Sequence, residues 1–441
     1  MGAGLPAPTR QFDNKKETTM LRIQRLTAIL LMTSAPFAAS IAQPTTLVPA
    51  EPESVGVSSA RLRLLDTMLR QHVDDGRVAG LVAGVARHGK IVYLESMGWQ
   101  DIEAGSAMRD DSIFQIRSMT KPITSLAVMQ LVEAGRIGLD DPVSKYIPSF
   151  ADMQVFVNPQ DPDNSPTRAP SREPTIEDLL LNIGGLSHRD RELYMSRQVR
   201  SRSEPLDVLV EKIADVPLMG DPGAQWIYSE SASVLGRVIE VVTGQKFDAY
   251  LDEHVLGPLR MPDTAFHVPA DKVDRLARIY QVPRDEGALT QVPDMDVPIT
   301  TNPPLLEGSA GMVSTVPDYL RFLQTFLDGG TLDGERVLSA PLIAEMTKNH
   351  IPEALLPIGL SPQSPMLDRG WGYGFTVVID EAKSEFGVNN GEFGWNGSLG
   401  TFSWADPETD TVAILMLQIA PSGAYSLSGK FKALVYQSLL N

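Results

Sequence analysis

The chain of 441 residues contains no cysteine. That absence excludes a thiol nucleophile, a thiolate metal site and disulfide cross-links. Histidine is also scarce, and the six residues at positions 72, 88, 188, 254, 267 and 350 show no HExxH or other close ligand spacing. We therefore expect no metal site and no cofactor.

Basic residues are fewer than acidic ones. Lysine and arginine number 38 against 55 aspartates and glutamates, which gives a formal charge of −17. A nucleic-acid surface needs a basic face to neutralise phosphates, so we expect no nucleic-acid partner. With 43% hydrophobic and 21% charged residues, the composition is that of a globular protein with a large core, and its length allows two domains.

The chain also lacks an apolar run long enough to span a bilayer near its start. The run "LTAILLMTSAPFAA" is short, follows Arg22 and Arg25, and precedes the small residues Ser40-Ile41-Ala42. This pattern predicts a secretory signal after a polar extension, residues 1–19, and cleavage after Ala42 would leave 441 − 42 = 399 residues. We expect a secreted or periplasmic protein with no stable membrane anchor after cleavage. An N-terminal amphipathic helix is the alternative.

Local patterns indicate strands and helices at both ends of the chain. A helix is expected from Ser58, followed by a β-hairpin around His88-Gly89-Lys90 and a helix from Ser118 to Glu133. Beyond residue 310, one amphipathic helix, three strand-like segments and a closing helix follow. These patterns predict a sheet domain built from residues 43–138 and 304–441.

The middle of the chain, residues 139–303, has helical patterns separated by proline-rich loops. It is predicted to be a mainly helical insertion, with a helix broken at Gly244. Two stretches, residues 158–174 and 282–304, are loops by composition. Loops of this length often border a binding site.

The stretch "RSMTKP" places Ser118 and Lys121 three residues apart at the start of an apolar helix. Residues at this spacing are neighbours on a helix. The helix start adds free N–H groups and a positive field, which favour an oxyanion and disfavour a second cation. A lysine set against apolar neighbours there could be partly neutral and accept the serine proton. Taken alone, the motif also fits a solvated first-turn lysine.

Two further segments fit such a site. Tyr228, in "WIYSE", could pass a proton through its hydroxyl, although it could equally be a packed loop tyrosine. In "FGWNGSLGTF", Gly397 allows close approach to a ligand, and the N–H of Ser398 could face an oxyanion, although a plain hairpin is the simpler interpretation. No GxSxG occurs, which excludes the usual nucleophile elbow, and His188 is expected to be a loop residue.

Together, in this order, the three segments resemble the serine hydrolase superfamily of class C β-lactamases, penicillin-binding DD-peptidases and family VIII carboxylesterases. The resemblance extends over nearly all of residues 55–440. Supporting stretches are "GLDDPVSKYIP", "TIEDLLLNIGGLS", "YSESASVLGRVIEVVTGQ", "GMVSTVPDYLRF" and "WGYGF". The implied fold is α/β (α+β), an antiparallel sheet flanked by helices plus an all-helical domain, with the site between them.

The resemblance also implies roles for individual residues. Ser118 would be the acylated nucleophile, with Lys121 as its proton acceptor or as a charge that tunes the pair. Tyr228 would protonate the leaving group and then activate water. The backbone N–H groups of Ser118 and Ser398 would form the oxyanion hole, and Trp395 and Gly397 would contact the substrate. Which of Lys121 and Tyr228 is the acylation base stays open.

Two departures bear on the substrate. Glu230 stands where lactamases and DD-peptidases usually have asparagine, and Trp395-Asn396-Gly397 replaces KTG or HxG. Losing that cation removes an anchor for a β-lactam or peptide carboxylate, so the resemblance favours a carboxylesterase acting on small-molecule esters. The alternatives are a β-lactamase or D-amino-acid peptidase and, outside enzymes, a non-catalytic binding or penicillin-sensing protein. The acyl chain, the alcohol and the oligomeric state are not specified by the sequence.

Overall fold

The computed structural model of the chain describes Met1 and residues 46–440, apart from residues 190, 285–286, 294–296, 362 and 385–386. The predicted polar extension and secretory signal therefore lie outside the described residues, apart from Met1, and secretion stays a prediction. Within the described part, no helix is both long and apolar enough to cross a membrane.

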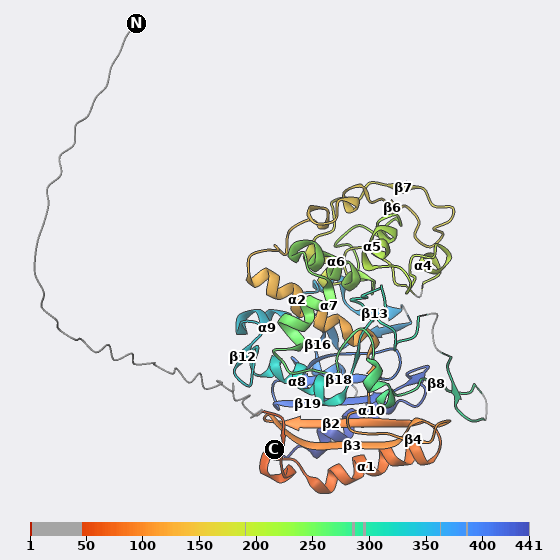
Figure 1. The fold of residues 1–441 in the computed structure, drawn as a ribbon, viewed down its shortest axis with the longest axis vertical. Helices are drawn as coiled ribbons and strands as arrows, with labels where there is room; N and C mark the ends of the chain where they lie inside the picture. Colours follow the sequence, from red (N-terminus) through yellow and green to blue (C-terminus); the bar gives the residue numbers. More distant parts are fainter. Residues whose placement is uncertain are drawn as a thin grey trace, which may run out of the picture. The chain divides into compact units, whose positions relative to one another are not determined.

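A nine-stranded sheet within the described residues forms the lower part of the fold (Figure 1). Its strands follow the order β1-β3-β2-β19-β18-β17-β16-β15, with β4 paired to β3; β1 runs parallel to β3 and the other pairs are antiparallel. The bounds are β1 Val48–Pro49, β2 Gly80–Arg87, β3 Lys90–Asp101, β4 Ser106–Ala107, β15 Arg369–Trp371, β16 Thr376–Val378, β17 Phe393–Asn396, β18 Phe402–Asp406 and β19 Thr411–Leu417.

The sheet is assembled from both ends of the chain, because β2 pairs with β19 along its length. The predicted hairpin between β2 and β3 is confirmed. Its two turn residues, His88 and Gly89, have φ of 50° and 66°, the left-handed conformation that a two-residue hairpin requires.

Helices cover both faces of the sheet. On one face lie α1 (Ser59–Asp74) and α10 (Leu427–Ser438); on the other lie α2 (Thr120–Glu133) and α8 (Val316–Leu327). Successive residues of the central strands alternate between the two cores: Leu415 packs on the α1 side, Ile414 and Met416 on the α2 side. The predicted antiparallel sheet flanked by helices is thus confirmed.

Capping explains where two of these helices start. The Ser58 side chain accepts a hydrogen bond from the N–H of Arg61 at the start of α1, and Thr315 does the same for Asp318 at the start of α8. Such N-caps satisfy backbone donors that the first helical turn leaves free.

The middle of the chain forms the helical region in the upper part of Figure 1. Its helices are α3 Ile176–Leu180, α4 Glu192–Ser196, α5 Leu206–Ala214, α6 Ser231–Thr243 and α7 Phe247–Leu251, continued by a π-helical turn at Asp252–Leu256. The predicted break at Gly244 is confirmed, since this glycine ends α6 with φ of 75°. One large core joins these helices to the sheet, and the proposed domain boundaries at 138/139 and 303/304 stay predictions.

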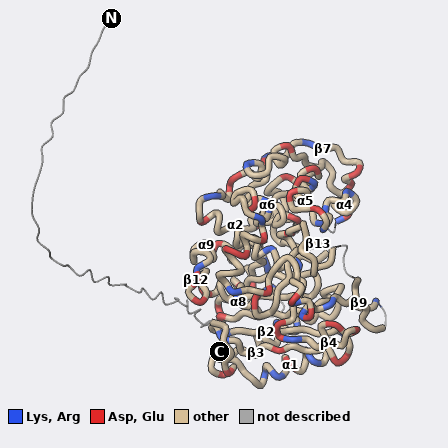
Figure 2. Tube along the Cα trace, viewed as in Figure 1, with Lys and Arg blue, Asp and Glu red and all other residues tan. Residues whose placement is uncertain are grey.

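Short elements complete the fold. They are β5 Phe114–Gln115 with β10 Val313–Ser314, β6 Val155–Phe156 with β7 Thr167–Arg168, β8 Tyr280–Gln281 with β9 Thr290–Gln291 and β20 Ile419–Ala420, β11 Thr331–Leu332 with β12 Glu335–Arg336, β13 Ile358–Ser361 with β14 Ser364–Met366, and helix α9 Ala340–Met346. Lysine and arginine intermingle with aspartate and glutamate through both regions (Figure 2).

Candidate active site

Ser118 lies in a 3₁₀ turn, Arg117–Met119, directly before α2. The sequence placed the helix start at Ser118, whereas the α-helix begins at Thr120. Arg117, the first residue of this turn, has φ of 48°, a left-handed conformation that costs a non-glycine residue about 1–2 kcal/mol. The residue before the predicted nucleophile is therefore strained, a feature typical of functional sites.

Lys121 is buried in the first turn of α2, as its apolar surroundings predicted. Its Nζ donates a hydrogen bond of 2.9 Å to the Ser309 carbonyl and lies 4.4 Å from the centre of the Tyr228 ring. Within the described contacts, it makes no hydrogen bond to Ser118. The lysine Nζ therefore lies against the face of the Tyr228 ring and is held there by the Ser309 carbonyl.

Tyr228 lies at the centre of an aromatic cluster whose other members come from separate segments of the chain. Trp395 Nε1 donates a hydrogen bond of 3.0 Å to Tyr228 Oη, and His188 stacks on the tyrosine ring at 5.3 Å. Trp395 packs edge-to-face on the buried Trp371 at 4.7 Å, and Trp226 stacks on Tyr228 at 6.0 Å. The tyrosine oxygen thus accepts a hydrogen bond from the indole, and Lys121 Nζ lies over the face of its ring.

Gly397 lies at the end of β17, where this strand meets the segment that carries Ser118. A Cβ at Gly397 would lie 2.5 Å from the Ile116 carbonyl oxygen, so only glycine allows this approach. Thr401 Oγ1 donates a hydrogen bond of 3.3 Å to the same carbonyl. These contacts bring Ser398 beside the nucleophile segment, as an oxyanion hole built from both would require.

One pocket of about 380 Å³ joins the predicted residues. Ser118, Tyr228, Trp395, Gly397 and Ser398 all line it, whereas Lys121 is not among its lining residues. We call it the catalytic pocket.

Three residues of the same loop, His188, Arg189 and Arg191, also line the catalytic pocket. Sequence reasoning treated His188 as a loop residue and did not single out the arginines. No group of three or more histidine, aspartate or glutamate side chains in the described part of the chain could hold a metal ion.

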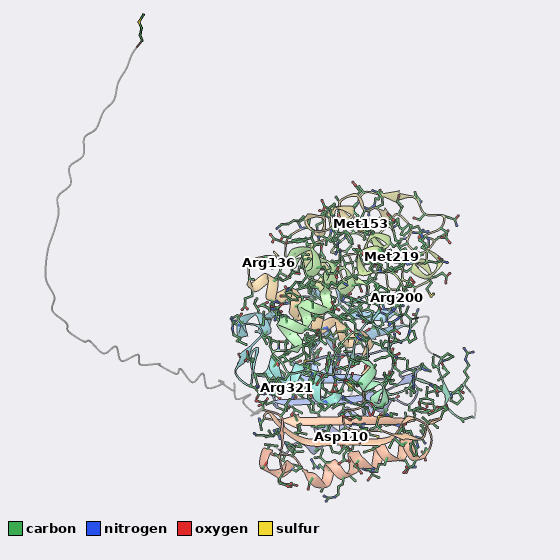
Figure 3. All side chains as sticks on the ribbon, viewed as in Figure 1. Asp110, Arg136, Met153, Arg200, Met219 and Arg321 are labelled. Carbon is green, nitrogen blue, oxygen red and sulfur yellow. The ribbon has the colours of Figure 1, made fainter. Side chains whose placement is uncertain are left out.

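A cluster of buried charges adjoins the pocket and was not predicted. Glu307 accepts hydrogen bonds from Arg189 at 2.7 Å and from Arg200 at 2.9 and 2.7 Å, and Glu230 lies 4.0 Å from Arg189. With Arg117, these residues form what we call the arginine cluster; Figure 3 labels Arg200 between the helical region and the sheet. The feature of the sequence that could have indicated this cluster is the repeated arginine between positions 189 and 202.

The charges of the arginine cluster act on one another. Burial would raise the pKa of Glu307, but Arg189 and Arg200 outweigh it and hold the pKa below its ordinary value. Burial, followed by the charge of Arg189, lowers the pKa of Arg117 to about 10. Positive charge is therefore in excess immediately before the nucleophile.

A hydrogen-bonded clasp connects the arginine cluster to Lys121. Ser233 Oγ lies 3.0 Å from Glu230 Oε2 and 3.2 Å from the Ser309 nitrogen, which donates to it. The Ser309 hydroxyl in turn accepts from the Ser233 nitrogen at 3.1 Å. Because the Ser309 carbonyl holds Lys121, this Ser233–Ser309 clasp fixes the position of the lysine.

Comparison with known proteins supports this arrangement. Residues 65–436 match the model of the Beta-lactamase family. Protein Rv1367c of Mycobacterium tuberculosis is 33% identical over 359 residues, covering 80% of this chain and 89% of that protein. Esterase EstB of Burkholderia gladioli is 31% identical over 397 residues, covering 84% of this chain and 94% of EstB.

A solved structure shows the same fold. EstCE1, described as a hydrolase with promiscuous acyltransferase activity, matches with a TM-score of 0.74 over 86% of this chain and 98% of EstCE1, at 24% identity. The predicted resemblance is confirmed by the family match and by the likeness to EstB. The chain therefore belongs to the β-lactamase family of serine hydrolases, with an esterase among its relatives.

Proposed function

We propose that the protein is a serine carboxylesterase that hydrolyses small-molecule esters through an acyl-enzyme on Ser118. One observation carries the proposal: Trp395 Nε1 donates to Tyr228 Oη in the pocket that Ser118 lines. Trp395 occupies the position where the lactamase motifs supply a cation, and an indole cannot pair with a substrate carboxylate. It can pack against a neutral ester. The likeness to Esterase EstB supports the same activity.

In the first step, Ser118 Oγ attacks the ester carbonyl carbon while its proton passes to Lys121 or Tyr228. The backbone N–H groups of Ser118 and Ser398 would stabilise the negative charge on the carbonyl oxygen. The tetrahedral intermediate then collapses, the carbon–oxygen bond to the alcohol breaks, and the alcohol leaves with a proton from Tyr228.

In the second step, water replaces the alcohol. Tyr228 takes a proton from the water, which attacks the acyl carbon. Breakage of the bond to Ser118 Oγ releases the carboxylic acid and returns the proton to the serine. The Ser233–Ser309 clasp holds Lys121 against the Tyr228 ring, and Trp395 Nε1 holds the tyrosine oxygen.

One observation favours β-lactam or D-amino-acid peptide hydrolysis as the second candidate. Arg191 is exposed and lines the catalytic pocket, and its guanidinium could bind a substrate carboxylate. A kcat/KM for nitrocefin comparable to that for esters would favour this candidate.

The test is hydrolysis of p-nitrophenyl butyrate by wild type and by Ser118→Ala. We expect the substitution to lower kcat by at least about a thousandfold, because the nucleophile is lost. Ser54→Ala, which changes an exposed serine, is the matched control and should keep the wild-type rate. An undiminished rate in Ser118→Ala would contradict the proposal.

Failure of both a fluorophosphonate and a labelled penicillin to modify Ser118 would instead indicate a non-catalytic protein.

A further inference from the structure

A second pocket, of about 720 Å³, adjoins the catalytic pocket. Tyr228, Arg191 and Leu360 line both pockets, so the two share a border at these side chains. The Arg191 guanidinium donates a hydrogen bond of 3.1 Å to the Leu360 carbonyl, which ties the start of α4 to β13 at the border. We call this second pocket the side chamber.

The lining of the side chamber is mostly apolar. It includes Trp226, Met219, Leu193, Leu355 and Ile358; Figure 3 labels Met219 in the helical region. Among the described lining residues, only Arg191 and Glu192 carry charge. A chamber of this size and character is typical of sites that hold a largely apolar ligand.

The two pockets contact different parts of the predicted catalytic machinery. Ser118, Trp395 and Ser398 are among the described residues that line the catalytic pocket only, whereas Tyr228 lines both. The Trp226 ring stacks on Tyr228 with an angle of 26° between their planes, so one aromatic wall runs from the tyrosine into the chamber. If one portion of an ester substrate is bound in the side chamber, the portion next to the reacting carbonyl carbon therefore lies beside Tyr228.

We propose that the side chamber binds the alcohol portion of the substrate, and that the enzyme acts on esters of bulky, uncharged alcohols. This inference rests on the proposed function, in which Tyr228 gives its proton to the departing alcohol. The alcohol oxygen must then lie beside Tyr228, and the group attached to it extends along the Trp226 wall into the chamber. The acyl portion stays on the side of Ser398.

The test compares three esters on the full chain: ethyl butanoate, 2-naphthylmethyl butanoate with a bulky alcohol, and ethyl 4-(2-naphthyl)butanoate with a bulky acyl group. We expect kcat/KM for the bulky alcohol to exceed that for ethyl butanoate by about tenfold or more, since buried apolar groups contribute on this scale. No comparable gain is expected for the bulky acyl ester.

Leu355→Trp should fill part of the chamber, because Leu355 is half-buried in its wall and does not line the catalytic pocket. We expect about a tenfold loss of kcat/KM for the bulky alcohol and little change for ethyl butanoate. Val157→Trp, at an exposed site that does not line the chamber, is the matched control. Ala354→Trp, also in the lining but exposed, repeats the test if Leu355→Trp folds poorly.

Equal losses for all three esters, or a loss confined to the bulky acyl ester, would overturn the assignment of the chamber. So would an unchanged ratio in both tryptophan variants. Failure of the proposed function has a different signature: wild type would then hydrolyse none of the esters, or Ser118→Ala would hydrolyse them as fast as wild type.

Discussion

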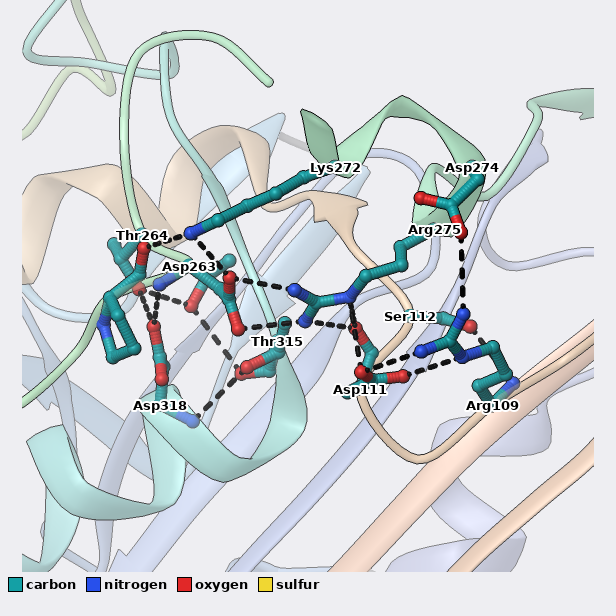
Figure 4. Close-up of polar contacts among 12 residues, drawn as sticks. Arg109, Asp111, Ser112, Asp263, Thr264, Lys272, Asp274, Arg275, Thr315 and Asp318 are labelled. Atoms are coloured by element: carbon teal, nitrogen blue, oxygen red, sulfur yellow. Dashed lines mark hydrogen bonds and ion pairs between the residues drawn. The ribbon is translucent and has the colours of Figure 1, made fainter. Parts of the chain in front are cut away.

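Two clusters of charged side chains differ in burial and in what lies beside them. In the arginine cluster, the side chain of Glu307 is 1% exposed and that of its partner Arg189 is 8% exposed, next to the catalytic pocket. In the second, which we call the aspartate cluster, Asp263 pairs with Lys272 and Arg275 near the start of α8 (Figure 4). There Asp263 is 15% and Lys272 26% exposed.

The difference shows how burial couples stability to activity. Water can partly hydrate Lys272 in the aspartate cluster when its partner is removed, so its pair with Asp263 resembles a surface pair, which contributes little to stability. In the arginine cluster, water hardly reaches Glu307 or Arg189, although Arg200 is 21% exposed, so a charge left alone on Glu307 or Arg189 carries a large desolvation cost. Because Arg117 directly precedes Ser118, disturbance of the arginine cluster should also move the nucleophile.

Glu307→Gln should have the largest effect. It removes the counter-charge that Arg189 and Arg200 share, although Glu230 stays 4.0 Å from Arg189, and breaking a buried pair in this way costs about 3–5 kcal/mol. We expect that loss in the free energy of unfolding, measured with urea, together with a lower kcat for p-nitrophenyl butyrate.

Asp263→Asn is the matched variant in the aspartate cluster. It removes the counter-charge of Lys272, whereas Arg275 keeps Asp111 as a partner at 3.2 Å. We expect a loss of only about 1–2 kcal/mol and an unchanged kcat, since water reaches Lys272. Equal losses of unfolding free energy in Glu307→Gln and Asp263→Asn would show that burial does not determine how much each cluster contributes to stability.

Asp318, which accepts a hydrogen bond from the Asp263 nitrogen, should make stability depend on pH. Burial raises the pKa of Asp318 to about 6, although Oδ2 accepts hydrogen bonds from the Asp263 nitrogen and Thr264 Oγ1. A carboxyl with a raised pKa binds its proton more tightly in the folded state. Its contribution to stability is therefore present below about pH 4 and is lost as the pH rises through 6.

Asp318→Asn keeps an oxygen acceptor but does not titrate. Relative to this variant, wild type should lose about 2 kcal/mol of unfolding free energy between pH 4.5 and 7.5, measured with urea at both values. Asp207→Asn, an exposed aspartate in the first turn of α5, is the control and should follow wild type. Parallel curves for wild type and Asp318→Asn would contradict the prediction.

The fold could be predicted wherever the signal was local. The β2–β3 hairpin depends on Gly89 and α1 on its Ser58 cap, and both are visible in a few adjacent residues. The pairing of β2 with β19 joins segments more than 300 residues apart, and no local pattern specifies it. The resemblance to a family, rather than periodicity, supplied that part of the fold.

The site divides in the same way. Ser118, Lys121 and Tyr228 belong to motifs and could be selected from the sequence, although their catalytic roles stay predictions. The hydrogen-bond partner of Lys121 could not be predicted from the sequence, because it is the backbone carbonyl of Ser309, and every residue has such a carbonyl. The pairing of Arg189 with Glu307 could not be predicted either, because the two residues are 118 positions apart in the sequence.

Ser233→Ala should have the smallest effect and tests whether the arginine cluster reaches Lys121. The variant removes the hydroxyl between Glu230 and the Ser309 nitrogen, so the carbonyl that holds Lys121 is less well fixed. We expect kcat for p-nitrophenyl butyrate to fall about tenfold, KM to change little and the pH profile of kcat to shift. Ser438→Ala, which removes another buried serine hydroxyl, controls for lost packing and should leave the pH profile unchanged. Equal pH profiles in the two variants would mean that the clasp stabilises the fold without positioning the lysine.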